Sequence, residues 1–307
     1  MSSINYLKEA TKNVEERLSK HGKQLCQKAV TPMESNYIPE TDDTPELDVE
    51  QIEFYQELIG ILRWATEIGR VDILTEVAIL SAYQASPREG HLRQLLHIFA
   101  YLKRNPKLSL YFDPQLPNIP DNVFNVETES FKEHYRDAKD ELPYNMPKPL
   151  GRSVTITAYV DASHASNKVT RRSQTGFVIF VNRAPISWYS KRQSTVETST
   201  FSSEFIAMKT CIESIESLRF KLRMFGVPID GPAKVLCDNE GVVRNSSEFA
   251  SKLNKKHSSL AYHKTRWCVA AGIVLIGWVD TNDNLADAFT KRLSADKRDF
   301  LFGEWTY

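Results

Sequence analysis

Four carboxylates stand where elements of the chain are expected to begin or end, beside apolar segments: Asp161, Glu204, Asp238 and Asp287. Carboxylates that converge repel one another, and proteins tolerate such a cluster mainly when a hard cation lies between them. Four such oxygens at one place would suit two Mg²⁺ ions roughly 4 Å apart, as in enzymes that transfer phosphoryl groups. Whether the four side chains meet in the fold is therefore the central question about this chain.

The segment after residue 150 predicts strands and helices in a definite order. Strands are expected over 154–161, 175–181, 185–190, 233–238 and 273–279, and helices over 201–225, 258–271 and 284–293, with a short helix after 238. The first strand alternates apolar and polar residues, which is typical of a half-buried strand. A three-stranded meander followed by helical crossovers predicts an α/β fold with a mixed five-stranded sheet flanked by helices.

This order also places the carboxylates. Asp161 and Asp238 end the first and fourth expected strands, so parallel pairing brings both to the edge where open α/β sheets bind ligands. Glu204 lies in the first turn of the long helix, where the helix dipole favours its charged form. An apolar stripe follows beside it, formed by Phe205, Met208, Ile212, Ile215, Leu222 and Phe225. Asp287 lies off the apolar line of the last helix, so core packing does not position it.

Each carboxylate taken singly also has a purely structural interpretation. Asp161 could form a strand-end turn, and Glu204 could serve as an ordinary first-turn acid. The pair Asp238-Asn239 could cap the next helix, and Asp287 could pair with Lys291 at i+4. The joint order of the four residues favours a common site.

Composition divides the chain into four stretches. Residues 1–50 predict a charged helix and an acidic linker, 51–112 a small helical unit, 113–150 a linker with six prolines, and 151–307 the α/β domain. Within the first half, helical periodicity covers 49–68, 71–84 and 89–103. The helical unit shows no catalytic cluster.

The charges are divided unevenly between the halves of the chain. The total of 39 basic and 39 acidic residues balances, but residues 151–307 hold 22 lysines and arginines against 15 aspartates and glutamates. A basic C-terminal half indicates a polyanionic partner, although a solvated surface would have the same composition. The four cysteines form no C-x-x-C pair, and no apolar run reaches membrane-spanning length. We therefore expect an intracellular protein without a zinc knuckle or a membrane partner.

Seven blocks of sequence resemble the ribonuclease H domain at the C-terminal end of Ty1/copia-type retrotransposon polyproteins. They are Tyr159-Val-Asp-Ala-Ser-His-Ala165, Arg171-Arg-Ser-Gln-Thr-Gly-Phe177, Ile186-Ser-Trp-Tyr-Ser-Lys-Arg-Gln193, Ser203-Glu-Phe-Ile-Ala207, Asp238-Asn-Glu240, Lys256-His257 with Tyr262-His263, and Leu285-Ala-Asp-Ala-Phe-Thr-Lys291. The resemblance implies a ribonuclease H-like fold. It also implies that Asp161, Glu204, Asp238 and Asp287 are the catalytic residues and the metal ligands.

Upstream segments are similar to the part of these polyproteins that follows the reverse-transcriptase palm. They are Val30-Thr-Pro-Met33, Tyr55-Gln-Glu-Leu-Ile-Gly-Ile-Leu62, Val71-Asp-Ile73 and Ala100-Tyr-Leu-Lys103. By this resemblance, residues 1–50 include the end of the palm, and residues 51–112 form a thumb- or connection-like unit. Polymerase activity is not expected, because Tyr159-Val-Asp-Ala162 lacks the second aspartate of a polymerase motif.

The resemblance implies hydrolysis of the RNA strand of RNA–DNA hybrids during reverse transcription, with two Mg²⁺ ions or with Mn²⁺ in their place. The implied partners are the hybrid and the palm and fingers of the parent polyprotein, in the cytoplasm within a virus-like particle or in the nucleus, with no small-molecule cofactor. Candidate phosphate contacts are Arg171, Arg172, Lys191, Arg192, Lys255 and Lys256.

One departure from the wider family concerns a histidine before the last aspartate. Residues 278–283 contain none, so His257 or His263 is the candidate auxiliary group. A non-enzymatic alternative also follows from the resemblance: the chain could be a catalytically silent, nucleic-acid-binding remnant of a degenerate element. The presence of all four carboxylates favours the enzyme.

Overall fold

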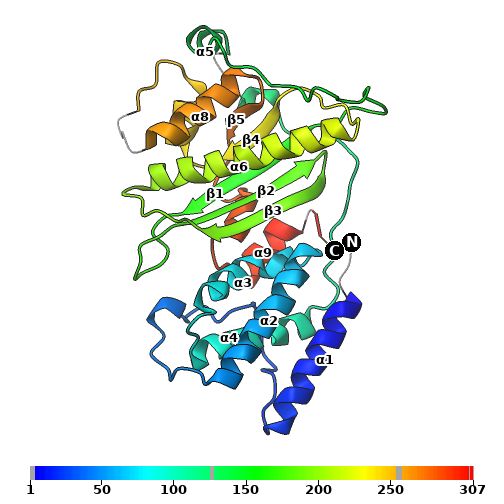
Figure 1. Ribbon diagram of the computed structural model, residues 1–307, viewed down its shortest axis with the longest axis vertical. Helices are drawn as coiled ribbons and strands as arrows, with labels where there is room; N and C mark the ends of the chain where they lie inside the picture. Colours follow the sequence, from blue (N-terminus) through cyan, green and yellow to red (C-terminus); the bar gives the residue numbers. More distant parts are fainter. Residues whose placement is uncertain (1–3, 125–127, 254–257, 304, 307) are drawn as a thin grey trace.

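A five-stranded sheet forms the upper half of the molecule and a helical unit forms the lower half (Figure 1). The computed structural model describes residues 4–124, 128–253, 258–303, 305 and 306. Lys255, Lys256 and His257, which the sequence proposed for binding and catalysis, lie outside the described residues. Within the described part, no helix combines the length and the apolar character needed to cross a membrane.

The predicted mixed sheet is confirmed. Its strands are β1 (Ile156–Ser163), β2 (Gln174–Val181), β3 (Ala184–Arg192), β4 (Ala233–Cys237) and β5 (Val274–Trp278). The spatial order is β3-β2-β1-β4-β5, with β1, β2 and β3 antiparallel to their neighbours in the meander. Strand β4 lies parallel to both β1 and β5. The expected crossover therefore sets the ends of β1 and β4 beside each other.

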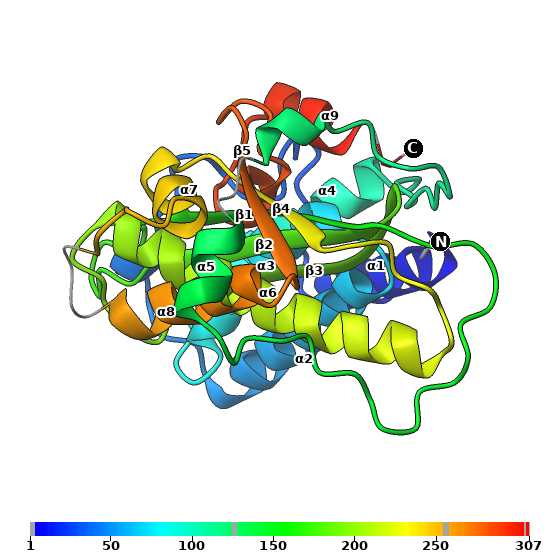
Figure 2. The same ribbon diagram turned by 90° about the horizontal axis from the view of Figure 1, so that it is seen from above.

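Helices cover one face of the sheet. They are α5 (Thr128–His134), α6 (Thr200–Met224), α7 (Glu240–Ser247) and α8 (Ser259–Ala270). Figure 2 shows α6 and α8 lying across the same side of the strands. Phe205, Met208, Ile212 and Ile215 of α6 are buried in this core as predicted. Phe225 is 81% exposed, because α6 has run past the sheet at that point, so the predicted stripe was too long.

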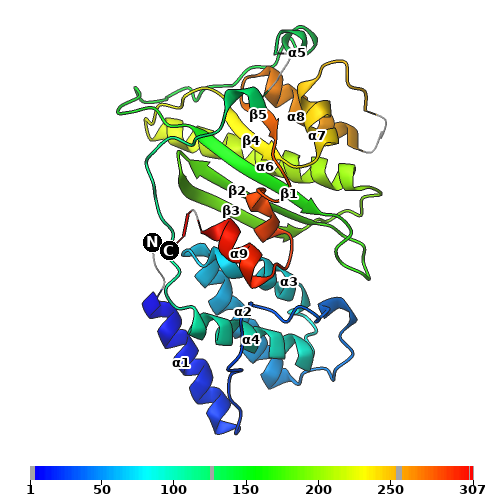
Figure 3. The ribbon, with the colours of Figure 1, turned by 180° about the vertical axis from the view of Figure 1, so that it is seen from behind.

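The second face of the sheet is covered as well, and β1 is therefore buried on both sides. The alternating pattern predicted a half-buried strand, but Thr157 is also inaccessible to solvent. Helix α9 (Ala295–Phe302) lies between the sheet and the helical unit, as seen from behind in Figure 3. Its Phe302 packs with Val178 and Phe180 of β2.

The helical unit has its own apolar core. Its elements are α1 (Ile4–Lys20), η1 (Pro39–Thr41), α2 (Val49–Glu67), η2 (Val71–Ile73), α3 (Leu74–Leu80), η3 (Ser81–Tyr83) and α4 (Glu89–Arg104). Helix α1 contributes Leu7, Val14 and Leu18 to the same core as α2 and α4. The short turn η4 (Asp121–Val123) and helix α5 interrupt the proline-containing segment, and Phe131 of α5 enters the core of the sheet.

Buried polar contacts join the two halves. Thr75 donates a 2.8 Å hydrogen bond to the carbonyl oxygen of Ala288, and the indole of Trp188 donates one of 3.0 Å to that of Thr66. Arg298 of α9 forms a 3.0 Å ion pair with Glu76 of α3, and both side chains are almost fully buried. Buried charges are stable only when paired, so these contacts hold the halves in one arrangement.

The end of the chain departs from the prediction of one helix over 284–293. The structure has a short 3₁₀ turn, η6 (Leu285–Phe289), before α9 begins. Asn284 explains the start of this turn, because its side chain accepts a 3.1 Å hydrogen bond from the backbone N–H of Ala286. The same side chain donates a 3.1 Å hydrogen bond to the carbonyl oxygen of Val160 in β1. Tertiary contacts rather than helical periodicity therefore shape this segment.

Candidate metal centre

The structure brings the four predicted carboxylates together at one end of the sheet. Oxygens of Asp161, Asp238 and Asp287 lie within 4.8 Å of one another. Glu204, Cys237 and Asp238 form a second group whose ligand atoms lie within the same distance. Asp238 belongs to both groups and so links Glu204 to the other two aspartates.

Two strands position the first pair of carboxylates. Val160 pairs with Cys237 across the parallel strands, which sets Asp161 and Asp238 side by side one residue further on. Asp161 lies within β1 rather than at its end, and Asp238 follows β4 directly. Asn239, rather than Asp238, accepts the capping hydrogen bond at the start of α7, so the carboxylate of Asp238 is not used as a helix cap.

Helix α6 carries Glu204 to the site, and turn η6 carries Asp287. The Ser199 side chain caps α6 by accepting a hydrogen bond from the backbone N–H of Ser202. The helix begins at Thr200, so Glu204 lies in its second turn rather than in the predicted first turn, and its side chain is buried near Cys237 and Asp238. Turn η6 packs against β2 opposite Asp161, where Gly176 is the residue paired with Asp161. A Cβ atom at Gly176 would lie 2.6 Å from Cγ2 of Thr290 and 2.8 Å from the backbone carbon of Phe289. The absence of a side chain there is what lets Asp287 approach the sheet.

Burial raises the pKa of three of these carboxylates. Asp161, Glu204 and Asp287 are only 2%, 6% and 5% exposed, respectively. Burial, reinforced by Asp287 and Asp238, raises the pKa of Asp161 to about 6, although Lys291 and Thr290 oppose the shift. Burial and the neighbouring aspartates also raise the pKa of Glu204 well above its ordinary value, and burial raises that of Asp287. The ionised forms of these carboxylates are therefore destabilised, and a cation bound among them would offset that cost.

Two neighbours of the carboxylates were not assigned a role from the sequence. The ammonium group of Lys291 lies 3.5 Å from Oδ2 of Asp161 and forms an ion pair with Asp287. Thr290 donates a hydrogen bond to Asp161. The i+4 pairing of Asp287 with Lys291 was considered as an alternative to a metal site, yet the structure contains both the pair and the cluster. Both Thr290 and Lys291 stand in the block Leu285-Ala-Asp-Ala-Phe-Thr-Lys291, and that position was the available sequence signal for these two neighbours.

The donor set suits a hard divalent cation. All four predicted ligands are carboxylates, which Mg²⁺ and Mn²⁺ prefer. Among the described residues, Oε2 of Glu204 is buried and has no hydrogen-bond partner. An unpaired buried carboxylate oxygen is costly, and a cation coordinated there would remove that cost.

The remaining predicted residues fall in three places. Arg171 and Arg172 lie in the connection between β1 and β2, and Lys191 and Arg192 end β3 at the same end of the sheet as Asp161. His263 lies on α8 and makes a 2.8 Å hydrogen bond with Tyr135, outside both carboxylate groups of the described residues.

His164 is a neighbour of the site that sequence reasoning missed. It follows β1, and its Nδ1 lies 3.3 Å from the hydroxyl of Ser203, the residue before Glu204. The histidine stands in the first block, three residues after Asp161, which was the available signal.

The raised pKa of Asp161 predicts an unusual pH dependence of stability in the absence of metal. Between about pH 4 and pH 6 the folded protein keeps a proton that the unfolded chain has lost. Stability should therefore fall as the pH rises through this window, by about 3 kcal/mol at most for this group. Thermal unfolding in EDTA at several pH values, compared with Asp161→Asn, measures the effect. Equal pH slopes for the two proteins would contradict the prediction.

Lys291→Met should destabilise the metal-free protein, because Asp161 and Asp287 lose their neighbouring cation. We expect a loss of roughly 1–3 kcal/mol, since partners of buried charges matter more than exposed pairs. The matched control is Lys209→Met, which removes an ion pair of the same i,i+4 spacing and a lysine with the same 36% exposure, but from an exposed glutamate. Thermal unfolding in EDTA compares the two. A loss no greater than that of the control would count against the assigned contact.

The mixed five-stranded sheet with the order β3-β2-β1-β4-β5 and its flanking helices form a ribonuclease H-like fold. Homologues of the chain are Ty1/copia-type retrotransposon Pol polyproteins, which confirms the resemblance. The chain is 25% identical over 240 residues to the retrovirus-related Pol polyprotein from transposon RE1 of Arabidopsis thaliana, covering 78% of this chain and 14% of that protein. It is 24% identical over 243 residues to the polyprotein from transposon TNT 1-94 of Nicotiana tabacum, covering 79% and 15%. The chain thus spans about one seventh of the length of these relatives.

Solved structures similar to this chain include ribonuclease H domains. The N-terminal RNase H domain of Rv2228c from Mycobacterium tuberculosis aligns with a TM-score of 0.34 at 15% identity, over 50% of this chain and 99% of that one. LC11-RNase H1 in complex with an RNA/DNA hybrid aligns with a TM-score of 0.36 at 17% identity, over 44% and 94%. No family model matches the chain.

Proposed function

We propose that this chain is a metal-dependent nuclease of the ribonuclease H type that cuts the RNA strand of RNA–DNA hybrids. The observation that supports this most is the convergence of Asp161, Glu204, Asp238 and Asp287 from four separate elements, with one buried oxygen unpaired. The convergence is the stronger part of this observation, because several buried carboxylates in one place repel one another unless a cation lies between them.

The four carboxylates would hold Mg²⁺, or Mn²⁺ in its place. When bound, such ions lower the pKa of a coordinated water and stabilise the departing oxygen of a phosphodiester. The chain's own contribution is positional. Strands β1 and β4 fix Asp161 and Asp238, the N-terminal part of α6 fixes Glu204, and η6 fixes Asp287. Thr290 restrains one oxygen of Asp161 by a hydrogen bond.

The proposed substrate is recognised by shape and charge. Arg171, Arg172, Lys191 and Arg192 lie at the acidic end of the sheet and would contact phosphates. Contacts to phosphates and 2′-hydroxyls select A-form geometry rather than base sequence. The palm and fingers of a parent polyprotein would present the hybrid, with the helical unit as the connection between them.

A cleavage assay with the full chain tests the proposal. Matched oligonucleotides are offered as RNA–DNA hybrid, duplex RNA and duplex DNA, each with Mg²⁺, Mn²⁺ or EDTA. We expect cuts only in the RNA strand of the hybrid and only with metal. Hybrid binding without any cleavage would instead support the silent remnant.

A further inference from the structure

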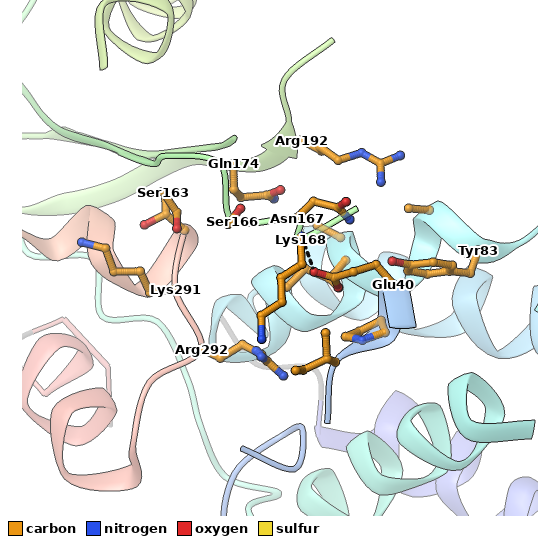
Figure 4. Close-up of a pocket in the computed structure, with 16 residues that line it drawn as sticks. Glu40, Tyr83, Ser163, Ser166, Asn167, Lys168, Gln174, Arg192, Lys291 and Arg292 are labelled. Carbon is orange, nitrogen blue, oxygen red and sulfur yellow. Dashed lines mark hydrogen bonds between the residues drawn. The ribbon is translucent and has the colours of Figure 1, made fainter. Parts of the chain in front are cut away.

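Two neighbouring hollows lie along the junction between the sheet and the helical unit, next to the carboxylates. The first has a volume of about 290 Å³ and is drawn in Figure 4. The second has a volume of about 630 Å³. Arg192 lines both hollows, and Ala78 and Ala82 of the helical unit also line both. Together they form one surface that we call the junction groove.

The junction groove begins at the metal centre. Thr290 and Lys291, which contact Asp161, line the wall of the first hollow. From there the groove passes Arg192 and continues between β3 and the helical unit, where Arg172 and Lys191 line the second hollow. The two hollows therefore adjoin each other at Arg192, and the first of them adjoins the carboxylates.

The charge of the groove is strongly unbalanced. Lys168, Arg192, Lys291 and Arg292 line the first hollow against a single carboxylate, Glu40. Lys291 is paired with Asp161 and Asp287, and Arg292 donates a hydrogen bond to the carbonyl oxygen of Tyr37. Within the part of the chain that the structure describes, neither the ammonium of Lys168 nor the half-buried guanidinium of Arg192 has a hydrogen-bond or ion-pair partner. A half-buried guanidinium without a partner is expected where an anion binds.

In the first hollow, the carboxylate of Glu40 occupies a position that an anionic ligand could take. Its Oε1 accepts a 2.7 Å hydrogen bond from the backbone N–H of Lys168, in the connection after β1. Figure 4 shows the carboxylate of Glu40 directed at the backbone of Lys168, with Tyr83 next to Glu40 and the side chains of Arg192 and Arg292 on either side. A backbone N–H next to lysine and arginine side chains is the donor set that binds phosphate oxygens.

We propose that the junction groove binds the sugar-phosphate backbone of a nucleic-acid strand beside the cut, and that Glu40 is the internal occupant that a phosphate displaces. That the strand belongs to an RNA–DNA hybrid rests on the proposed function. The helical unit is then one wall of the substrate site, and the segment carrying Glu40 competes with the substrate. Removing the charge of Glu40 strengthens binding, whereas removing the charge of Arg192 weakens it.

Fluorescence anisotropy with a labelled RNA–DNA hybrid tests this in the full chain, using Asp161→Asn throughout so that the substrate stays intact. Adding Arg192→Ala should weaken binding about tenfold and reduce the dependence on salt by about one phosphate contact. Adding Glu40→Gln should tighten binding a few-fold, because the competing carboxylate has lost its charge. Lys12→Ala is the control, since this lysine is exposed on α1 and forms only a surface pair with Glu16.

An unchanged affinity and salt dependence for Arg192→Ala would overturn the groove, and an unchanged affinity for Glu40→Gln would overturn the role of Glu40. Thermal unfolding of each variant separates loss of binding from loss of fold. The proposed nuclease is judged independently from the chain with Asp161 intact. If the variants change the affinity but the chain with Asp161 intact does not cleave, the groove is supported and the nuclease is refuted. If that chain cleaves but the variants leave the affinity unchanged, the nuclease is supported and the groove is refuted.

Discussion

Asp161→Asn should lower metal-dependent cleavage of an RNA–DNA hybrid by at least about a thousandfold. Asp161 is the most buried of the four carboxylates, at 2% exposed, and its oxygen lies within 4.8 Å of oxygens of Asp238 and Asp287. An amide has nearly the same shape but lacks the charge that a cation requires. A metal ion contributes several kcal/mol to stabilising the transition state, and each 1.36 kcal/mol corresponds to a factor of ten in rate. Single-turnover cleavage with Mg²⁺ measures the loss.

The matched control is Asp283→Asn, the same chemical change at an exposed aspartate four residues before Asp287. It should cleave as the parent does. Asp161→Asn should remain folded in EDTA, because replacing one of several crowded carboxylates relieves repulsion. Cleavage by Asp161→Asn at a rate near that of the parent would show that the site has been assigned wrongly.

Gly176→Ala should displace Asp287 from the metal site, although Gly176 is not itself a predicted ligand. The new methyl group would overlap Cγ2 of Thr290 and the backbone of Phe289, so η6 has to move away from β2 and carry Asp287 with it. Overpacking of this kind costs roughly 1–3 kcal/mol. A displacement of about 1 Å at a catalytic group can reduce the rate about a hundredfold. We therefore expect loss of both stability and metal-dependent cleavage, measured by thermal unfolding and by the hybrid assay.

Gly60→Ala is the control for this prediction. A Cβ atom at Gly60 would meet no atom within 4 Å, and the residue lies within helix α2. Alanine should leave cleavage unchanged and stabilise the helix by up to about 1 kcal/mol. If Gly176→Ala behaved like Gly60→Ala, the close packing of η6 on β2 would not be what positions Asp287.

Prediction from the sequence succeeded where local patterns determine structure. The order of strands and helices sufficed to place Asp161 and Asp238 side by side, because parallel strands joined by a helical crossover end at the same edge. Helical periodicity placed Glu204 beside the buried stripe of α6. These inferences need only the residues of each element and the rules of sheet topology.

The sequence did not predict features of the structure that depend on contacts between distant segments of the chain. Turn η6 replaces the expected helix because Asn284 bonds both to β1 and to its own turn, and because Gly176 leaves room for it. Thr157 is buried on the second face of the sheet, where it lines a hollow with segments distant in the sequence, among them Ile119 and Trp305. Neither fact is visible in the periodicity of the segment concerned.

The buried pair between Glu76 and Arg298 has a consequence for expressing either half of the chain alone. Separating the halves would leave Glu76 and Arg298 without their partners, and would expose the apolar surface of the C-terminal half that Val71 and Leu110 cover. Such a surface promotes self-association. We therefore expect the α/β domain expressed without the helical unit to aggregate more readily than the full chain.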